Sequence, residues 1–324
     1  MTTVVAGTRA VADDRVTTAV HALVADLAID APPEALPGAD LVVAAEQRHE
    51  LPEPGRLLRA ADGWFHPGPP TAWADFTAMT VALGAGPPVA PDGLPDLAAL
   101  TIDALDAEAA AWLLPATAVR ADPAAAPRVA AVPTSPSASV AGARVAVLGT
   151  AWATPLVGLL LARLGVDVVR VDDPRREDPF PLATRLARGQ QRMGLDLATS
   201  SGRAGLRSLL ARVDLLVDGY TPRVLANAGL GDEVLDREFP HVARLRIAAF
   251  AHSDRPGYGL AAECRGGWAA RTDPPTLGRS SVADPVAGCL GAREAVALLC
   301  AGGGTARVTL EGAVGHLLAG GGAR

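Results

Sequence analysis

Short apolar runs alternate with helix-spaced apolar residues through the C-terminal part of the chain. Runs typical of buried strands occupy 143–148, 166–171, 214–220, 242–250 and 306–311, and helical spacing occupies 154–165, 201–213 and 286–301. Buried strands that alternate with helices indicate a parallel sheet covered on both faces. The pattern therefore predicts an α/β fold, with a Rossmann-like domain over residues 140–324.

The N-terminal part has a weaker pattern. Residues 57–68 predict a hairpin that turns at Asp62 and Gly63, and residues 97–114 predict helices for which Asp106 is the expected cap. We therefore expect a small α+β domain over residues 1–120. Residues 121–139 are rich in Pro, Ala and Ser, a composition typical of linkers, and are expected to join the two domains.

Charge and composition exclude several classes of function. The net charge of −6 gives no electrostatic reason to expect nucleic acid or an anionic membrane as partner. Every basic residue is an arginine, so Schiff-base chemistry, a P-loop lysine and pyridoxal attachment are excluded. The six histidines form no metal-binding pair, and we expect no metal.

The chain holds three cysteines, Cys264, Cys289 and Cys300. Their odd number and unpaired spacing indicate neither a disulfide framework nor a zinc motif. Because Cys289 and Cys300 lie about three helical turns apart, both are expected to face the core from one helix.

No targeting or membrane segment is expected. The first residues lack a basic region followed by an apolar run, so no signal peptide is predicted. Residues 145–162 carry no charge, but Gly149, Thr154 and Pro155 interrupt them, which favours a strand, a turn and a helix over a membrane span. We expect a cytoplasmic protein.

The usual activities of a Rossmann-like domain lack their motifs here. The loop after the first strand has no G-x-G-x-x-G, which argues against a dinucleotide although Asp172 and Asp173 end the second strand at a ribose-binding position. No G-x-S-x-G elbow indicates a serine hydrolase. We therefore expect no bound cofactor.

Asp284 stands where the helix predicted over 286–301 begins. An aspartate followed by Pro285 is a favoured N-cap and first-position pair, because the carboxylate accepts free amide protons and proline has none. On spacing alone a cap is favoured over a nucleophile.

Four stretches of the C-terminal part change this weighing. They are residues 140–174, which end in "VDDP"; residues 188–230, with "RGQQRMGLDL" and "GYTPRVLANAGL"; residues 239–259, with "RPGYG"; and "VADPVAGCLGAREAVALL" over 282–299. In this order they resemble the class III CoA-transferases, the family of formyl-CoA transferase, carnitine CoA-transferases and alpha-methylacyl-CoA racemase.

The resemblance implies that Asp284 is the catalytic aspartate and that coenzyme A is a substrate. In the family, the carboxylate attacks an acyl-CoA thioester to give a mixed anhydride, and the CoA thiolate then forms an aspartyl-CoA thioester. An incoming carboxylic acid takes the CoA by the reverse steps. A helix N-terminus favours an ionised acid, so cap and nucleophile are compatible.

The same resemblance implies candidates for CoA binding. Arg188 and Arg192 fall where the family has basic residues, and Tyr220 and Arg223 belong to "GYTPR". Thr221 occupies the place of a family arginine, so Arg223 is either its substitute or a solvated surface residue. Surface roles are an equal alternative for Arg188 and Arg192.

For the substrate pocket the candidates are Trp152, Tyr258 and Gly259. Racemisation is disfavoured, because it needs a histidine at Tyr258 and a glutamate after the hairpin, where "PGPPTAWADF" has none. The family's glycine-rich loop is not evident in 1–120. The alternative function is a catalytically weak subunit of a hetero-oligomer that binds CoA or an acyl group.

The hairpin "LLRAADGWFHPG" resembles the small domain of the family, where R-x-x-D-G is typical. There the small domain follows the Rossmann-like part, whereas here it precedes it. The chain therefore resembles a circular permutant or a fusion of two fragments. We expect a homodimer, with a hetero-oligomer as the alternative, acting on an acyl-CoA and a carboxylic acid.

Overall fold

A parallel sheet of six strands organises the residues that the computed structural model describes, which are 14–27, 55–86, 93–122, 124–127, 140–175, 182–278 and 281–320. The strands are β4 (Arg144–Leu148), β5 (Asp167–Asp172), β6 (Gln191–Gly194), β7 (Leu215–Asp218), β8 (Ala243–Ala248) and β9 (Thr305–Thr309). Their spatial order is β6-β5-β4-β7-β8-β9, and all pairs are parallel. The order reverses beside β4, which is the arrangement of a doubly wound sheet.

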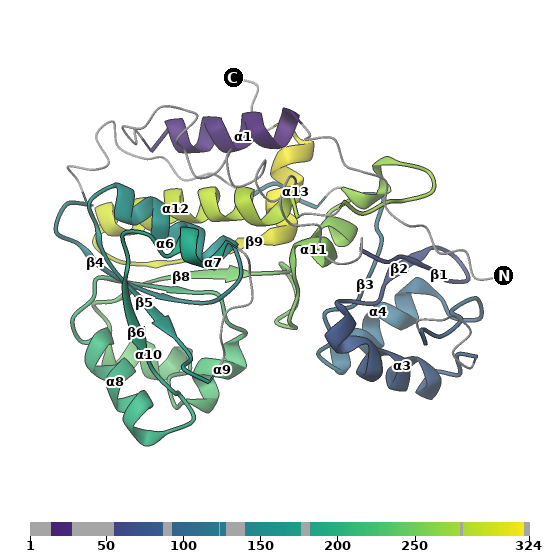
Figure 1. Cartoon of the computed structure of the whole chain (residues 1–324), viewed down its shortest axis with the longest axis horizontal. Coiled ribbons are helices and arrows are strands. Elements are labelled where there is room, and N and C mark those ends of the chain that lie inside the picture. The colour runs from purple at the N-terminus through teal and green to yellow at the C-terminus, as the bar shows by residue number, and fades with distance from the viewer. Residues whose placement is uncertain are drawn as a thin grey trace.

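Helices cover both faces of this sheet, as Figure 1 shows. On one side lie α1 (Asp14–Ala25), α6 (Ala153–Arg163), α12 (Ala283–Ala301) and α13 (Leu310–Leu318), and on the other lie α8 (Ser200–Leu210), α9 (Pro222–Asn227) and α10 (Asp232–Glu238). The short helices α7 (Ala183–Leu186) and α11 (Gly259–Arg265) follow β5 and β8. The predicted α/β fold class is confirmed.

The strand β4 shows why the sequence gives this layered fold. Val145 and Val147 point into the core shared with α6 and α12, whereas Ala146 and Leu148 point into the core under α8. Successive residues of a strand face opposite sides of the sheet, so an unbroken apolar run is what a strand buried on both faces requires.

Strand β8 is covered by apolar side chains on one face only. Leu245 and Ile247 are buried towards α12, whereas Arg244 and Arg246 alternate with them and are only partly covered. Beneath β8 and β9 the second face of the sheet is therefore lined by charged groups.

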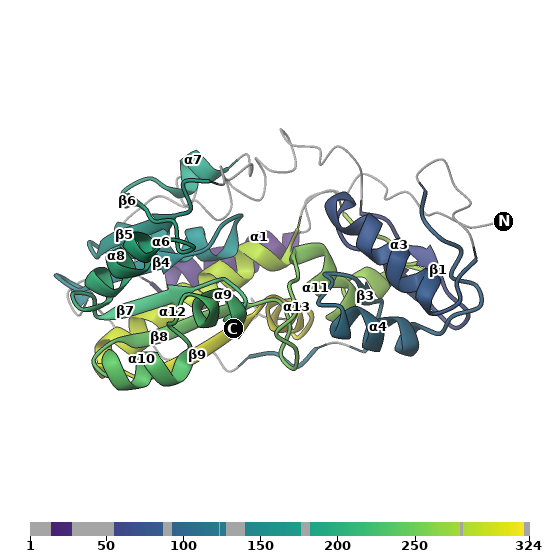
Figure 2. The ribbon, with the colours of Figure 1, turned by 90° about the horizontal axis from the view of Figure 1, so that it is seen from below.

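Residues 55–120 form a small α+β region at the end of the molecule beyond α11 (Figures 1 and 2). Its elements are β1 (Leu58–Arg59), β2 (Trp64–His66), β3 (Thr117–Ala118), α3 (Trp73–Ala82) and α4 (Ile102–Ala111), with a 3₁₀ turn at Pro70–Ala72. The three strands are antiparallel in the order β1-β2-β3, and the predicted hairpin is present. Phe65 and Phe76 stack in its core with ring centroids 6.0 Å apart.

Asp106 is not the helix cap that the sequence predicts. Thr101 caps α4, since its hydroxyl accepts the amide proton of Ala104 at 3.3 Å. Asp106 lies inside α4 and accepts hydrogen bonds from Arg255 at 2.8 Å and from Arg265 at 2.6 Å, two residues of the large-sheet part. These guanidinium groups hold the small region against the segment around α11.

The helix α1 lies within the segment 1–120 but packs with the large sheet. Val16, Val20 and Leu23 belong to the same buried core as α6 and α12. The small region, in the part of the chain that the structure describes, therefore comprises residues 55–120. Most of the predicted linker, residue 123 and residues 128–139, lies outside the described residues, and the division of the chain at 121–139 stays a prediction.

Two further expectations are wrong in detail. Cys289 is buried, but Cys300 is exposed, because the last turn of α12 is only partly covered. The strand predicted over 306–311 ends at Thr309, whose hydroxyl accepts the Gly312 amide at 3.0 Å and starts α13. Across the described residues, no helix has the length and apolarity to span a membrane.

Candidate active site

Three helix N-termini converge on the Asp284 carboxylate at the carboxyl edge of the sheet. Asp284 itself is in the first turn of α12, and the amide of Ala153, the first residue of α6, donates to its carboxylate. Gly259, the first residue of α11, is buried against it. The partial positive charges of these helix ends favour the carboxylate anion.

The prediction that Asp284 is the N-cap of its helix is wrong. Helix α12 begins at Ala283, so Asp284 and Pro285 already lie within it. The Ser281 hydroxyl accepts the amides of Ala283 at 3.2 Å and of Asp284 at 3.3 Å. Because Ser281 takes these amide protons, the Asp284 carboxylate is not needed to cap the helix.

The electrostatic setting of Asp284 is that of a desolvated, unpaired acid. Its side chain is half-buried, and desolvation raises its pKa, although the Ser281 hydroxyl and the Ala153 amide act in the opposite direction. No arginine of the described residues contributes to its pKa. A half-buried carboxylate whose pKa is perturbed by desolvation is a candidate functional group.

Close approach to this carboxylate explains the glycine at position 259. A Cβ built on Gly259 would overlap the Ser281 hydroxyl and an Asp284 carboxylate oxygen. Tyr258, the N-cap of α11, is 54% exposed, and Trp152, the N-cap of α6, is buried. All three predicted pocket residues therefore lie at the helix ends that surround Asp284.

Glu263 is a site residue that the sequence analysis missed. It is fully buried in α11 and accepts the amide of Val282 at 2.8 Å, directly before α12. Burial and, to a smaller extent, the charge of Asp284 together raise its pKa to about 8. The available signal was an acid inside the otherwise apolar "GLAAEC", where a charge has no solvated face to occupy.

Two of the predicted CoA-binding residues, Tyr220 and Arg192, lie at or near the carboxyl ends of strands in the large sheet. Tyr220 follows the end of β7, and desolvation together with the charges of Asp173 and nearby acids raises its pKa to about 12. Arg192 of β6 pairs with Asp172 at 2.7 Å, at the end of β5. Both therefore border the ends of the central strands, where ligands of doubly wound sheets bind.

Arg188 and Arg223 are exposed. Arg223 lies in the first turn of α9, just after the carboxyl end of β7. Arg188 follows α7, and its neighbour Gly189 lies near Ala162 in the second half of α6. No contact of the described residues links Arg188 to Asp284 or to Tyr220.

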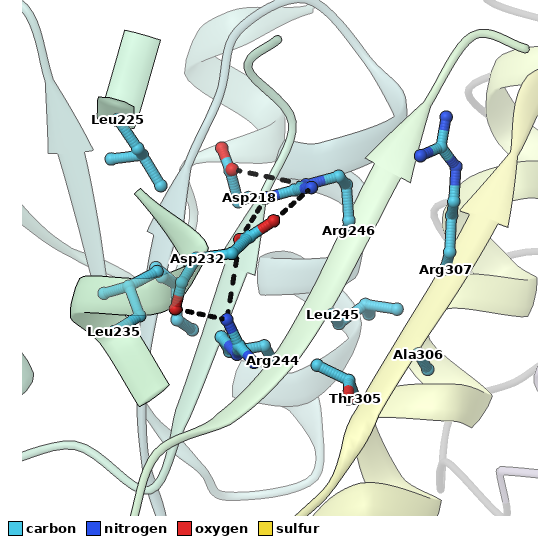
Figure 3. A pocket seen from close by; sticks show the side chains of 11 residues that line it. Asp218, Leu225, Asp232, Leu235, Arg244, Leu245, Arg246, Thr305, Ala306 and Arg307 are labelled. Atoms are coloured by element: carbon cyan, nitrogen blue, oxygen red, sulfur yellow. Dashed lines mark hydrogen bonds and ion pairs between the residues drawn. The ribbon is translucent and has the colours of Figure 1, made fainter. Parts of the chain in front are cut away.

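A cavity among the described residues lies away from Asp284, under β7, β8 and β9. It measures about 300 Å³, and Figure 3 shows Asp232 between Arg244 and Arg246. Asp232 accepts from Arg246 at 2.9 Å and lies 3.5 Å from Arg244. Arg244 and Arg246 of this cavity pair with its own Asp232. Arg307 pairs with Asp254 outside the lining, and Asp284 does not line the cavity.

Comparison with known proteins gives one family. The model of CoA-transferase family III matches residues 140–307. The chain is 31% identical over 176 residues to succinyl-CoA–D-citramalate CoA-transferase of Chloroflexus aurantiacus, which is 48% of this chain and 44% of that protein. It is 29% identical over 179 residues to the succinyl-CoA–L-malate CoA-transferase beta subunit of that organism, 49% of this chain and 44% of that one.

The matched part spans less than half the length of these relatives. A crystal structure of a hypothetical protein from Mycobacterium tuberculosis has the same fold, with a TM-score of 0.51 and 23% identity over 56% of each chain. The residues that the family model matches include Asp284.

Proposed function

Since the chain belongs to CoA-transferase family III, we propose that it moves coenzyme A between an acyl-CoA thioester and a carboxylic acid, with Asp284 as the nucleophile. The observation that carries this proposal is a half-buried carboxylate at the meeting point of three helix N-termini, with no arginine partner among the described residues. The helix N-termini favour its anionic form, and no ion pair of those residues neutralises it.

The proposed reaction begins when an Asp284 oxygen attacks the thioester carbon. The carbon–sulfur bond breaks, a mixed anhydride forms, and the CoA thiolate leaves. The thiolate then attacks the Asp284 carbonyl carbon, which releases the first carboxylate and leaves an aspartyl-CoA thioester. The incoming carboxylate reverses both steps, and Asp284 is regenerated without any redox change.

A backbone amide at a helix end supports each tetrahedral oxyanion in this proposal. The Ala153 amide at the start of α6 already donates to Asp284 and is the donor proposed for this role, since the Ala283 and Asp284 amides of α12 donate to Ser281. Fixed donors of this kind stabilise developing negative charge. The reaction as proposed needs no cofactor, because coenzyme A is itself a substrate.

The nucleotide part of CoA is proposed to lie along the carboxyl ends of β5, β6 and β7. Tyr220 would contact the adenosine part, and Arg192 and Arg223 its phosphates. Arg188 is the weakest of the candidates, because no contact places it beside the others. Trp152 and Tyr258 would flank the acyl group beside Asp284.

The test is transfer of CoA to an isotopically labelled acid by the purified chain. Succinyl-CoA with labelled citramalate or malate is the first pair to use, because the relatives carry these names. Labelled acyl-CoA, and a hydroxamate at Asp284 after hydroxylamine is added, are the expected products. Transfer without any modification of Asp284 would overturn the proposed mechanism.

A second candidate function is a CoA-binding subunit that needs a partner chain. Two observations favour it: Gly259 contributes no side chain beside Asp284, and the matched part is less than half of each relative, one of which is named a beta subunit. Transfer by the isolated chain would exclude this candidate. Binding of CoA without transfer would support it.

The assembly is proposed to be a homodimer, with a hetero-oligomer as the alternative. Light scattering of the purified chain at micromolar concentration distinguishes them from a monomer, whose mass is 32.9 kDa. A cytoplasmic location stays a prediction. Racemisation is not proposed, because Tyr258 stands where the resemblance places the histidine of the racemases.

A further inference from the structure

Two carboxyl groups, Glu263 and Asp284, share one buried environment. Glu263 accepts the Val282 amide, and Asp284 accepts the Ala153 amide. The Ser281 hydroxyl is the common neighbour that hydrogen-bonds with both groups. Two acids this close in a desolvated site do not readily ionise together.

The surroundings distinguish the two acids. Glu263 is fully buried, and its Oε2 atom has no hydrogen-bond partner among the described residues. Asp284 is half-buried and receives the amide of a helix end. The proton of the pair therefore belongs on Glu263, and the negative charge belongs on Asp284.

The charged groups on the elements packed around α11 do not neutralise Glu263. Arg265 of α11 is engaged by Glu311 of α13 at 3.2 Å and by Asp106 of α4 at 2.6 Å. Other ionisable groups also lie on these elements. His66 of β2 is buried with a lowered pKa, and Cys264 of α11 has a raised pKa. Arg271, in the 3₁₀ turn Ala269–Arg271, lies over the Trp268 ring. Asp284 is thus the charge that faces Glu263.

We propose that Glu263 is a positioning residue that keeps a proton at neutral pH, so that the site carries a single negative charge and Asp284 is its ionised nucleophile. This inference rests on the proposed function of Asp284. Every step of CoA transfer brings an anion, a carboxylate or the CoA thiolate, to the site. A second fixed negative charge on Glu263 would repel each of them.

Protonation of Glu263 also decides where the Ser281 proton goes. The Ser281 oxygen already accepts the amides of Ala283 and Asp284, so its hydroxyl has a single proton to donate to one of the two carboxyl groups. With Glu263 protonated, this proton is free for the Asp284 carboxylate. Glutamine keeps the acceptor for the Val282 amide and keeps a donor, without any charge. Glu263→Gln therefore mimics the proposed state, whereas Glu263→Ala removes the group altogether.

The experiment follows transfer rate against pH for the wild type and for both variants. The wild-type kcat/KM is expected to fall as the pH rises through about 8, where Glu263 ionises. Glu263→Gln should keep most of the rate at pH 7 and lose this alkaline fall. Glu263→Ala should be about tenfold slower at pH 7, because the Val282 amide loses its partner.

A measurement without turnover separates this inference from the proposed function. In protein labelled with ¹³C at glutamate carboxyl groups, NMR should show one carboxyl that titrates near pH 8 in the wild type and is missing in Glu263→Gln. This signal without CoA transfer would overturn the proposed function alone. Transfer without this signal, or the same alkaline fall in Glu263→Gln, would overturn the role of Glu263. If Glu263→Gln does not fold, the presence or absence of the wild-type signal decides.

Discussion

Asp106 and Asp284 are both aspartates removed from bulk water within a helix, and their surroundings are opposite. Asp106 accepts hydrogen bonds from Arg255, Arg265 and Thr117. These groups lower its pKa although burial by itself would raise it. Asp284 has helix amides and a hydroxyl but no guanidinium, and burial raises its pKa.

The contrast separates a joint from the proposed reactive site. An acid with two arginine partners is held in its charged form. Its ion pairs stabilise the contact between the small region and the segment around α11. An acid that is desolvated without a cation keeps its reactivity, at a cost in stability. Four predictions follow this contrast, beginning with the largest expected effect.

The first prediction replaces Asp284, the proposed nucleophile. Asp284→Asn is expected to lower CoA transfer by at least about 1,000-fold, because an amide is not a nucleophile. The folded protein should be no less stable at pH 7. The pKa of Asp284 in the folded protein lies above its unfolded value, so the wild-type protein loses stability as the pH rises between these two values. The Asp284→Asn protein does not, because asparagine does not ionise.

Transfer assays and urea unfolding measure these two effects. The matched control is Asp122→Asn at an exposed aspartate, which should change neither. Full transfer activity in Asp284→Asn would remove Asp284 from the mechanism.

Replacing Asp106, the acid of the joint, should lower stability rather than transfer activity. Asp106→Ala is expected to cost about 3 kcal/mol in urea unfolding, because the buried guanidinium of Arg255 loses its charge partner. The difference from the wild type should narrow in acid. The folded pKa of Asp106 is lowered, so its stabilising contribution is present at neutral pH and is lost as pH falls through that folded value.

The same helix offers a control. Asp103 pairs with Arg120 at 2.8 Å on the surface, with the side chain of Asp103 78% exposed. Asp103→Ala should therefore cost less than about 1 kcal/mol. Equal losses in the two variants would mean that Asp106 has no special part in the joint.

Gly259→Ala probes the closeness of α11 to the reactive acid. The added methyl group would overlap Ser281 and Asp284, so it should displace the carboxylate and lower transfer by about 100-fold. Gly231→Ala is the control, because its Cβ would lie 3.7 Å from Ala226, an ordinary contact. Unchanged transfer in Gly259→Ala would show that the position of the carboxylate is not critical.

Asp218 is an intermediate case and should show the smallest effect. It is buried, its ion-pair contact to Arg246 is long at 3.8 Å, and burial raises its pKa to about 7. The unfolded pKa is near 4, so wild-type stability should fall as the pH rises from about 4 to 7. Asp218→Asn should remove that fall and be about 2 kcal/mol more stable at pH 8.

Urea unfolding at pH 5 and pH 8 measures the difference in stability between Asp218→Asn and the wild type. The same difference at both pH values would show that Asp218 ionises normally and that its long contact to Arg246 is sufficient to stabilise the charge.

The sequence alone determined five of the six strands of the large sheet, the helices α6, α8 and α12 and the hairpin, and it pointed to Asp284 as a candidate. Burial and turns can be seen in adjacent residues of the sequence. Strand β4 is the apolar run "RVAVL" because both of its faces are covered, and the hairpin turn uses Asp62 and Gly63. The motif around Asp284 is likewise contiguous. The polar edge strand β6 shows no such pattern, because it has little apolar surface to bury.

Only the tertiary structure decided the partners of these residues. Asp106 and Arg255 are 149 positions apart, and no local pattern distinguishes a helix cap from an acid that meets a distant guanidinium. Ser281 took the cap that the sequence assigns to Asp284, and Glu263 came to the site through the packing of α11 on α12. The charge state of an acid depends on what surrounds it in space, and spatial neighbours are set by the fold of the whole chain rather than by adjacent residues.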